Sequence, residues 1–75
     1  MQKKNLYKIV GKNIQKERQK QGLTQETFAE LMGVSWSYVS KMESGILNLS
    51  LGKVLEISEF LNIDINLLLE IPIDK

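Results

Sequence analysis

An apolar pattern of helical period, cut into short segments, restricts the fold of this chain more than any other feature. Apolar residues recur three and four positions apart, and no stretch alternates with the period of two that is typical of strands. Glycines and hydroxyl side chains interrupt the pattern at short intervals, which limits each helix to a few turns. The sequence therefore predicts an all-α fold, a compact bundle of five short helices. The expected helices cover residues 6–21, 25–32, 36–43, 51–61 and 65–70.

Residue types that favour helix ends mark most of these boundaries. Thr24, Ser35 and Ser50 are predicted N-caps, because a side-chain oxygen at that position accepts a hydrogen bond from an N–H of the first turn. Gly22 and Gly33 follow predicted helices and can adopt the left-handed backbone conformation that ends a helix. The apolar stripes predict the inward positions. On the first and fourth helices these are Leu6, Ile9, Val10, Ile14, Leu51, Val54, Leu55, Ser58 and Leu61.

Size and composition exclude several classes of protein. The 75 residues, 43% hydrophobic and 25% charged, predict one small globular domain over residues 1–75. The absence of cysteine and histidine excludes disulfides and the common zinc sites, and it leaves no ordinary nucleophile–base pair. We therefore expect no enzyme activity, no metal and no cofactor. The longest apolar run, Leu67–Leu69, is too short to span a membrane, and the N-terminus lacks a signal-peptide pattern, so we expect a cytoplasmic protein without a membrane partner.

Charge is distributed unevenly along the chain, although the net charge is only +1. Residues 1–41 contain eight lysine or arginine residues and three glutamates, whereas residues 42–75 contain two lysines and six acidic residues. This asymmetry favours a basic face for phosphates and an acidic face turned away from them. The alternative is two solvated faces whose charges differ by chance.

The most informative segment is residues 25–42, QETFAELMGVSWSYVSKM. Two short helices joined by Gly-Val-Ser must cross steeply, which requires a small side chain such as Ala29 at the crossing and a glycine such as Gly33 at the start of the turn. Five apolar residues fall at the inward positions of the two helices: Phe28, Met32, Val34, Val39 and Met42. This combination is typical of the DNA-binding helix-turn-helix.

These residues resemble the phage repressor and Cro type of helix-turn-helix, also called the xenobiotic-response-element-like family. The resemblance extends over residues 10–69 and is carried by Gly22-Leu23-Thr24-Gln25, Phe28-Ala29, Gly33-Val34-Ser35, Ser37–Lys41, Glu43-x-Gly45 and Asn48–Leu51. It implies a lambda-repressor-like bundle of four or five helices. It also implies binding of double-stranded operator DNA to repress or activate transcription.

The resemblance assigns DNA contacts to both helices of the motif. Helix 36–43 becomes the recognition helix, with Trp36, Ser37 and Lys41 in base-reading positions; lysine can donate to guanine O6 or N7. Trp36 departs from the family pattern, which favours a polar or basic residue there. Its indole could pack on a thymine methyl group and donate its N–H to an acceptor, or lie back over the neighbouring helix. Phosphate contacts are expected from Gln25, Tyr38, Ser40 and Asn48. The alternative for Gln25 is an ordinary polar residue of the first turn, and the alternative for Lys41 is a solvated surface lysine.

Arg18, the only arginine of the chain, and Glu43 match a family ion pair that links the first helix to the recognition helix. Arginine suits this role because its planar guanidinium group can bond a carboxylate at two points and stays charged. We expect the pair to be structural, in preference to a phosphate contact by Arg18.

A homodimer is expected because one recognition helix reads only a few base pairs. Ile46 and Leu47 replace cations that are common in the family, so each subunit is predicted to make few phosphate contacts. Two copies would read a palindrome with half-sites roughly 34 Å apart. Four apolar residues within residues 62–75 have no obvious place in the core and form the candidate dimer surface: Ile63, Leu67, Ile71 and Ile73. The alternative is that this tail folds over its own core.

Several functions are compatible with this sequence. Chain length and Asn48–Leu51 resemble the controller proteins of restriction-modification systems, while a phage repressor, an antitoxin or a general regulator is also compatible. No small-molecule effector is evident. The alternative from a different class is a protein-interaction module that keeps the fold without binding DNA, which Trp36 and the cation-poor loop favour.

Overall fold

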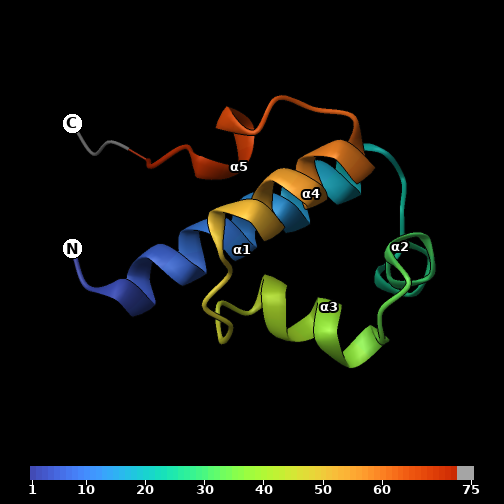
Figure 1. Ribbon diagram of the computed structural model, residues 1–75, viewed down its shortest axis with the longest axis horizontal. Helices are drawn as coiled ribbons and strands as arrows, with labels where there is room; N and C mark the ends of the chain where they lie inside the picture. The colour runs from blue at the N-terminus through green and yellow to red at the C-terminus, as the bar shows by residue number, and fades with distance from the viewer. Residues whose placement is uncertain (73–75) are drawn as a thin grey trace.

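The computed structural model describes residues 1–72, and over these residues it consists of five helices without a strand (Figure 1). Their bounds are α1 Lys3–Lys20, α2 Gln25–Met32, α3 Trp36–Glu43, α4 Leu51–Leu61 and α5 Asn66–Leu69. The predicted all-α bundle is therefore confirmed. The longest helix, α1, packs against α3, α4 and α5. Within the described part of the chain, no helix is long and apolar enough to cross a bilayer.

Hydroxyl side chains begin the three middle helices, as the sequence predicts. The side-chain oxygens of Thr24, Ser35 and Ser50 each accept a hydrogen bond from the amide three residues later, at 3.0–3.1 Å. Each of these bonds satisfies an N–H that would otherwise have no partner in the first turn. Gly33 ends α2 in the left-handed region, with φ of 70°. The predicted N-caps and the predicted glycine at the end of α2 are therefore found in the structure.

The two terminal helices differ from their predicted bounds. Helix α1 begins at Lys3 rather than Leu6, because the amides of Asn5 and Leu6 donate to the carbonyl oxygen of Gln2 and close the first turn there. Helix α5 is limited to Asn66–Leu69, and the carboxylate of Asp64 accepts a hydrogen bond from its first amide at 2.8 Å. One or two hydrogen bonds decide such boundaries, and apolar periodicity does not report them.

One apolar core holds the helices together. It consists of Val10, Ile14, Phe28, Ala29, Val39, Met42, Val54, Ile57, Leu61 and Leu68. On α4 the predicted inward positions Leu51 and Leu55 are wrong, since these side chains are 72% and 48% exposed. The helix is rotated so that Ile57 is buried, which leaves the two leucines at the edge of the buried stripe. Leu6 on α1 is exposed as well.

Two glycines allow α1 and the end of α3 to approach each other backbone to backbone. A Cβ atom on Gly11 would collide with the carbonyl oxygens of Met42 and Glu43. Gly45, just after α3, has φ of 76°, and a Cβ atom there would overlap the backbone of Lys8. These close contacts fix α3 on α1 and so set the orientation of the helix that carries the candidate site.

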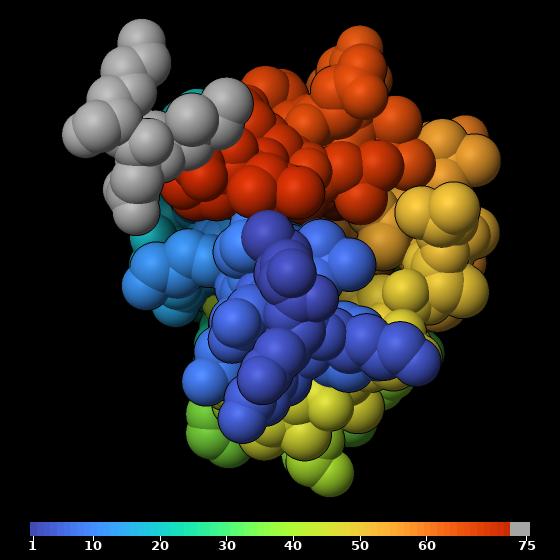
Figure 2. All heavy atoms as spheres, turned by 90° about the vertical axis from the view of Figure 1, so that its left-hand side faces the viewer, coloured from blue at the N-terminus to red at the C-terminus, as the bar shows by residue number. Residues whose placement is uncertain are grey.

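Asn13 connects the C-terminal helix to α1. Its buried side-chain amide donates to the carbonyl oxygens of Leu68 and Glu70 at 3.0 and 2.9 Å. Seen from the N-terminal end of α1 (blue), the C-terminal segment (red) lies above it, and the green and yellow segment that includes α3 lies below it (Figure 2). Helix α1 is thus the central element of the bundle.

Candidate nucleic-acid interface

Helices α2 and α3 form a helix-turn-helix unit, and α3 lies on the opposite side of α1 from α5 (Figure 1). Ala29 of α2 is buried, and the amide of Val34 in the turn donates to its carbonyl oxygen at 3.0 Å. The five apolar residues predicted to face inward do so. Phe28, Val39 and Met42 are buried, and Met32 and Val34 are partly buried and pack against the core. The unit therefore presents its other side to solvent.

The solvent side of α3 carries the residues predicted to read bases. Trp36, the first residue of α3, is 58% exposed, and Ser37 and Lys41 are exposed too. Ser40 is half-buried beside them, whereas Tyr38 packs partly against the core. We define the α3 face as Trp36, Ser37, Ser40 and Lys41. The structure thus brings the three base-reading candidates onto one surface.

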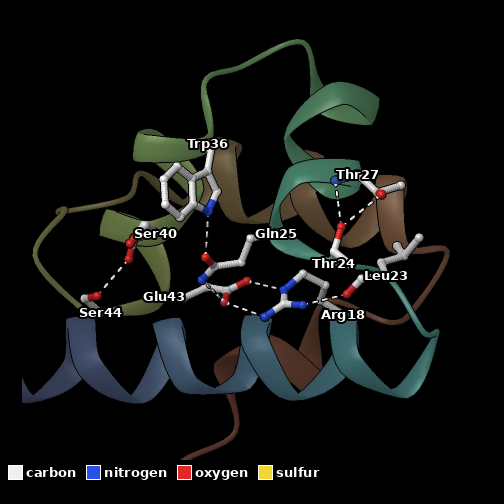
Figure 3. A network of polar contacts seen from close by, with 9 residues as sticks. All are labelled: Arg18, Leu23, Thr24, Gln25, Thr27, Trp36, Ser40, Glu43 and Ser44. Atoms are coloured by element: carbon white, nitrogen blue, oxygen red, sulfur yellow. Dashed lines mark hydrogen bonds and ion pairs between the residues drawn. The ribbon is translucent and has the colours of Figure 1, made fainter.

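A buried ion pair connects α1 to α3. Nε and Nη2 of Arg18 donate to Oε2 and Oε1 of Glu43 at 2.7 and 2.9 Å, and Nη1 donates to the carbonyl of Leu23 at 2.6 Å (Figure 3). The side chains of the pair are 7% and 3% exposed. This two-point geometry matches the structural pair that the family resemblance implies, and it holds the C-terminal end of α3 on α1.

Gln25, the first residue of α2, extends this network to Trp36. Its Nε2 donates to Oε1 of Glu43 at 3.0 Å, and its Oε1 accepts a hydrogen bond from Nε1 of Trp36 at 2.9 Å (Figure 3). This direction of the amide is the consistent one, because a carboxylate only accepts and an indole N–H only donates. The Arg18–Glu43 pair was predicted, but the two hydrogen bonds of Gln25 were not, since no local pattern signals contacts between residues that are so far apart along the chain.

Positive charge lies mainly on α1 and not on the α3 face. Lysines recur at every fourth position of this helix and all are exposed: Lys4, Lys8, Lys12, Lys16 and Lys20. Lys8 borders Gly45, so this part of the row adjoins the C-terminal end of α3. In the loop that follows α3, Asn48 is exposed, and Ile46 adds exposed apolar surface.

The candidate dimer surface is exposed only in part. Leu67 and Ile71 are 38% and 45% exposed. Ile63 is half-buried and packs against the core, which differs from its predicted place on the dimer surface. Ile73 lies outside the described residues.

Comparison with known proteins agrees with this geometry. A family profile described as helix-turn-helix matches residues 14–68. The solved restriction-modification controller protein C.AhdI from Aeromonas hydrophila is 38% identical, with a TM-score of 0.73, and the match covers 85% of this chain and 96% of that chain. A hypothetical transcription factor, NHTF from Neisseria, is 25% identical, with a TM-score of 0.82, and the match covers 96% of this chain and 83% of that chain. No curated protein sequence gives a significant match.

The matched segment contains the whole unit of α2, turn and α3 together with both residues of the ion pair. The two solved structures extend the similarity beyond this segment, to 96% of the chain in one case. The fold is that of helix-turn-helix transcription regulators, which bind double-stranded DNA. The chain belongs to the phage repressor and Cro type of the helix-turn-helix family.

Proposed function

We propose that this protein is a sequence-specific transcription regulator that binds double-stranded DNA as a homodimer on a palindromic operator. The observation that carries the proposal is the α3 face, which exposes an aromatic ring and hydrogen-bonding side chains on a helix held by a buried ion pair. A helix of this kind fits the major groove, where each base pair presents its own pattern of donors, acceptors and methyl groups. Helix α3 is the recognition helix in this proposal.

Each side chain of the α3 face has a distinct role. Lys41 donates to guanine O6 or N7, and Ser37 exchanges hydrogen bonds with several base edges. Trp36 offers the apolar surface of its ring. Because one such face reaches only a few base pairs, a second subunit is needed to define an operator.

Phosphate contacts position α3 in the groove. Gln25 keeps one side-chain N–H after it has donated to Glu43, and it begins α2, where free backbone amides and the helix dipole favour an anion. Ser40 and Tyr38 reach phosphates from α3, and Asn48 does so from the following loop. With Ile46 exposed in that loop instead of a cation, one subunit alone binds with modest affinity.

A second copy of this chain is the proposed partner of the candidate dimer surface, which we call the C-terminal surface. Leu67 and Ile71 expose apolar side chains there. A shallow apolar groove that includes Leu6, Leu51 and Leu69 extends the apolar surface next to α5. Acidic residues predominate in residues 42–75, which keeps this side of the molecule away from DNA. Two-fold pairing would place two α3 helices on half-sites roughly 34 Å apart.

Control of a restriction-modification system is the biological role that we favour within this class. Its support is the 38% identity to the controller protein C.AhdI over 96% of that chain. Neighbouring genes for a restriction endonuclease and a DNA methyltransferase would support the role. Their absence would remove this assignment and leave the proposal of a DNA-binding regulator in place.

Selection of bound duplexes from a random DNA pool tests the proposal. The wild-type protein is expected to enrich a palindrome with half-sites about one helical turn apart. Lys41→Ala should enrich it poorly or with a changed half-site. Lys53→Ala removes a cation of α4 outside the α3 face, so it should enrich the wild-type palindrome. An absence of enrichment at low salt, where DNA binding is strongest, would contradict the proposal and favour a protein-interaction module.

A further inference from the structure

The side-chain hydrogen bond of Trp36 restricts how its indole ring can contact a base. The inference below rests on the proposed function, because it specifies which base the α3 face selects. Trp36 is the only tryptophan of the chain and is 58% exposed at the start of α3. An indole has one hydrogen-bond donor, Nε1–H, and no acceptor. That donor is engaged within the protein, since it bonds to Oε1 of Gln25 at 2.9 Å.

Gln25 cannot reverse its amide without losing this arrangement. Its Nε2 donates to Glu43, which is buried and held at two points by Arg18. A reversed amide would place its oxygen against the carboxylate and its NH2 group against the indole N–H, so both hydrogen bonds would be lost. Gln25 is therefore a positioning residue that fixes the direction of the indole ring of Trp36.

With its donor engaged, Trp36 meets a base only through the apolar atoms of its ring. The apolar feature that an unmodified base pair presents in the major groove is the C5 methyl group of thymine, whereas the other base edges present donors and acceptors that an indole ring does not satisfy. Cytosine methylated at C5 carries the same group at the equivalent position. Uracil and unmodified cytosine lack it.

We propose that Trp36 selects a C5-methylated pyrimidine, thymine or 5-methylcytosine, at one position of each half-site, and that Gln25 positions its ring for this contact. Methylation of cytosine at this position is then recognised as thymine is, so that DNA binding responds to the methylation state of the operator. Burial of one methyl group corresponds to about a fourfold change in affinity for one half-site and roughly fifteenfold when both half-sites change.

Base analogues in the selected operator test this inference. Each thymine is replaced in turn by uracil, which removes only the C5 methyl group, and affinity is measured by fluorescence anisotropy of a labelled duplex. One position in each half-site is expected to lose about fourfold in affinity. At that position cytosine should bind more weakly than thymine, and 5-methylcytosine should bind more tightly than cytosine.

Variants of two residues assign the effect to its source. Trp36→Phe keeps an apolar ring but loses the bond to Gln25, so its preference for the methylated base should fall to about that of Gln25→Ala, whereas Trp36→Gln should remove the preference. Gln25→Ala should lower the ratio of thymine to uracil affinity, because the indole is no longer held. If Gln25 contacted only a phosphate, the same variant would lower affinity and leave that ratio unchanged. Circular dichroism identifies any variant that fails to fold.

The outcomes separate this inference from the proposed function. If no operator is enriched, the proposed function fails and the inference fails with it. If an operator is enriched but uracil is tolerated at every thymine, the inference is overturned while DNA binding stands. Retention of the methyl preference by folded Trp36→Gln would overturn it as well. The inference is supported if one position in each half-site depends on the C5 methyl group in the wild type and this dependence is lost in Trp36→Gln.

Discussion

Glu43 accepts hydrogen bonds from residues of two other helices, Arg18 of α1 and Gln25 of α2. Its side chain is almost fully buried, so its charge depends on these donors in place of water. A buried ion pair of this kind adds less to stability than its geometry suggests, yet the loss of one partner is costly. At the scale of single residues, the position of the α3 face therefore depends on side chains that lie beneath it.

The variant Glu43→Gln should lower the free energy of unfolding by about 3 kcal/mol, because Arg18 stays charged and buried without its carboxylate. Urea denaturation followed by circular dichroism measures this loss. Glu56→Gln is the matched control, since Glu56 pairs with Lys53 at 3.3 Å on the surface. That control should change stability by less than about 1 kcal/mol. Equal losses in the two variants would contradict the structural role of Glu43.

A second change at this scale, Asn13→Asp, should loosen α5. A carboxylate has no donor for the carbonyl oxygens of Leu68 and Glu70, so we expect a loss of about 2 kcal/mol at neutral pH. Burial beside two carbonyl groups raises the pKa of the introduced carboxyl in the folded state above its unfolded value. Stability relative to the wild type is then lowest at neutral pH and recovers as the pH falls through the raised pKa, because the protonated acid can donate one hydrogen bond.

Thermal melts of Asn13→Asp and wild type between about pH 4 and pH 7 measure this dependence. Asn66→Asp is the control, because Asn66 is exposed in the first turn of α5, where a negative charge is tolerated or slightly favourable. A difference from the wild type that grows on acidification would show that Asn13 does not donate to these carbonyls.

At the scale of elements, the sequence predicts helices well where the signal is local. Thr24, Ser35 and Gly33 mark the ends of α2 and α3 through side-chain or backbone chemistry that needs no distant partner. The rotation of α4 could not be predicted in the same way. Leu51, Leu55 and Ile57 are all apolar, so more than one rotation of the helix buries a continuous stripe, and contacts with other helices decide between them.

Backbone contact between α1 and α3 leads to a prediction for Gly11. Gly11→Ala should lower the free energy of unfolding by about 3 kcal/mol, because the added methyl group meets carbonyl oxygens that cannot move without displacing α3. Gly52→Ala is the control, since its Cβ atom would have only the Ser50 hydroxyl nearby, at 3.9 Å. It should leave stability unchanged or raise it by up to about 1 kcal/mol. Denaturant titration compares the two, and a tolerated Gly11→Ala would contradict the close packing.

At the scale of the whole molecule, helices α3 and α5 lie on opposite sides of α1 (Figure 1). The sequence predicts the residues of the α3 face from the family resemblance, because the spacing of the motif determines which side of α3 is exposed. It did not predict the link between Gln25 and Trp36, which depends on how α2 is placed against α3. It also did not predict that Ile63 packs against the core, because the path of the chain after α4 is a property of the whole bundle.

Charged residues introduced into the proposed dimer interface test whether the protein is a homodimer. The double variant Leu67→Glu and Ile71→Glu should shift the protein towards monomer, because both exposed side chains would bring a charge into an apolar interface. Sedimentation equilibrium measures the dissociation constant. Leu31→Glu introduces one such charge at an exposed leucine of α2, outside this surface, and should leave the constant unchanged. A double variant that dimerises like the wild type would move the interface elsewhere.

The most direct test of the central claim, that the α3 face reads DNA sequence, is the ratio of affinities for the selected operator and a scrambled duplex of the same length. We predict a ratio of at least about 10³ at physiological salt for the wild type. Lys41→Ala should lower this ratio, and Lys53→Ala should preserve it. A wild-type ratio near one, or a ratio that Lys41→Ala and Trp36→Gln both leave unchanged, would contradict the account.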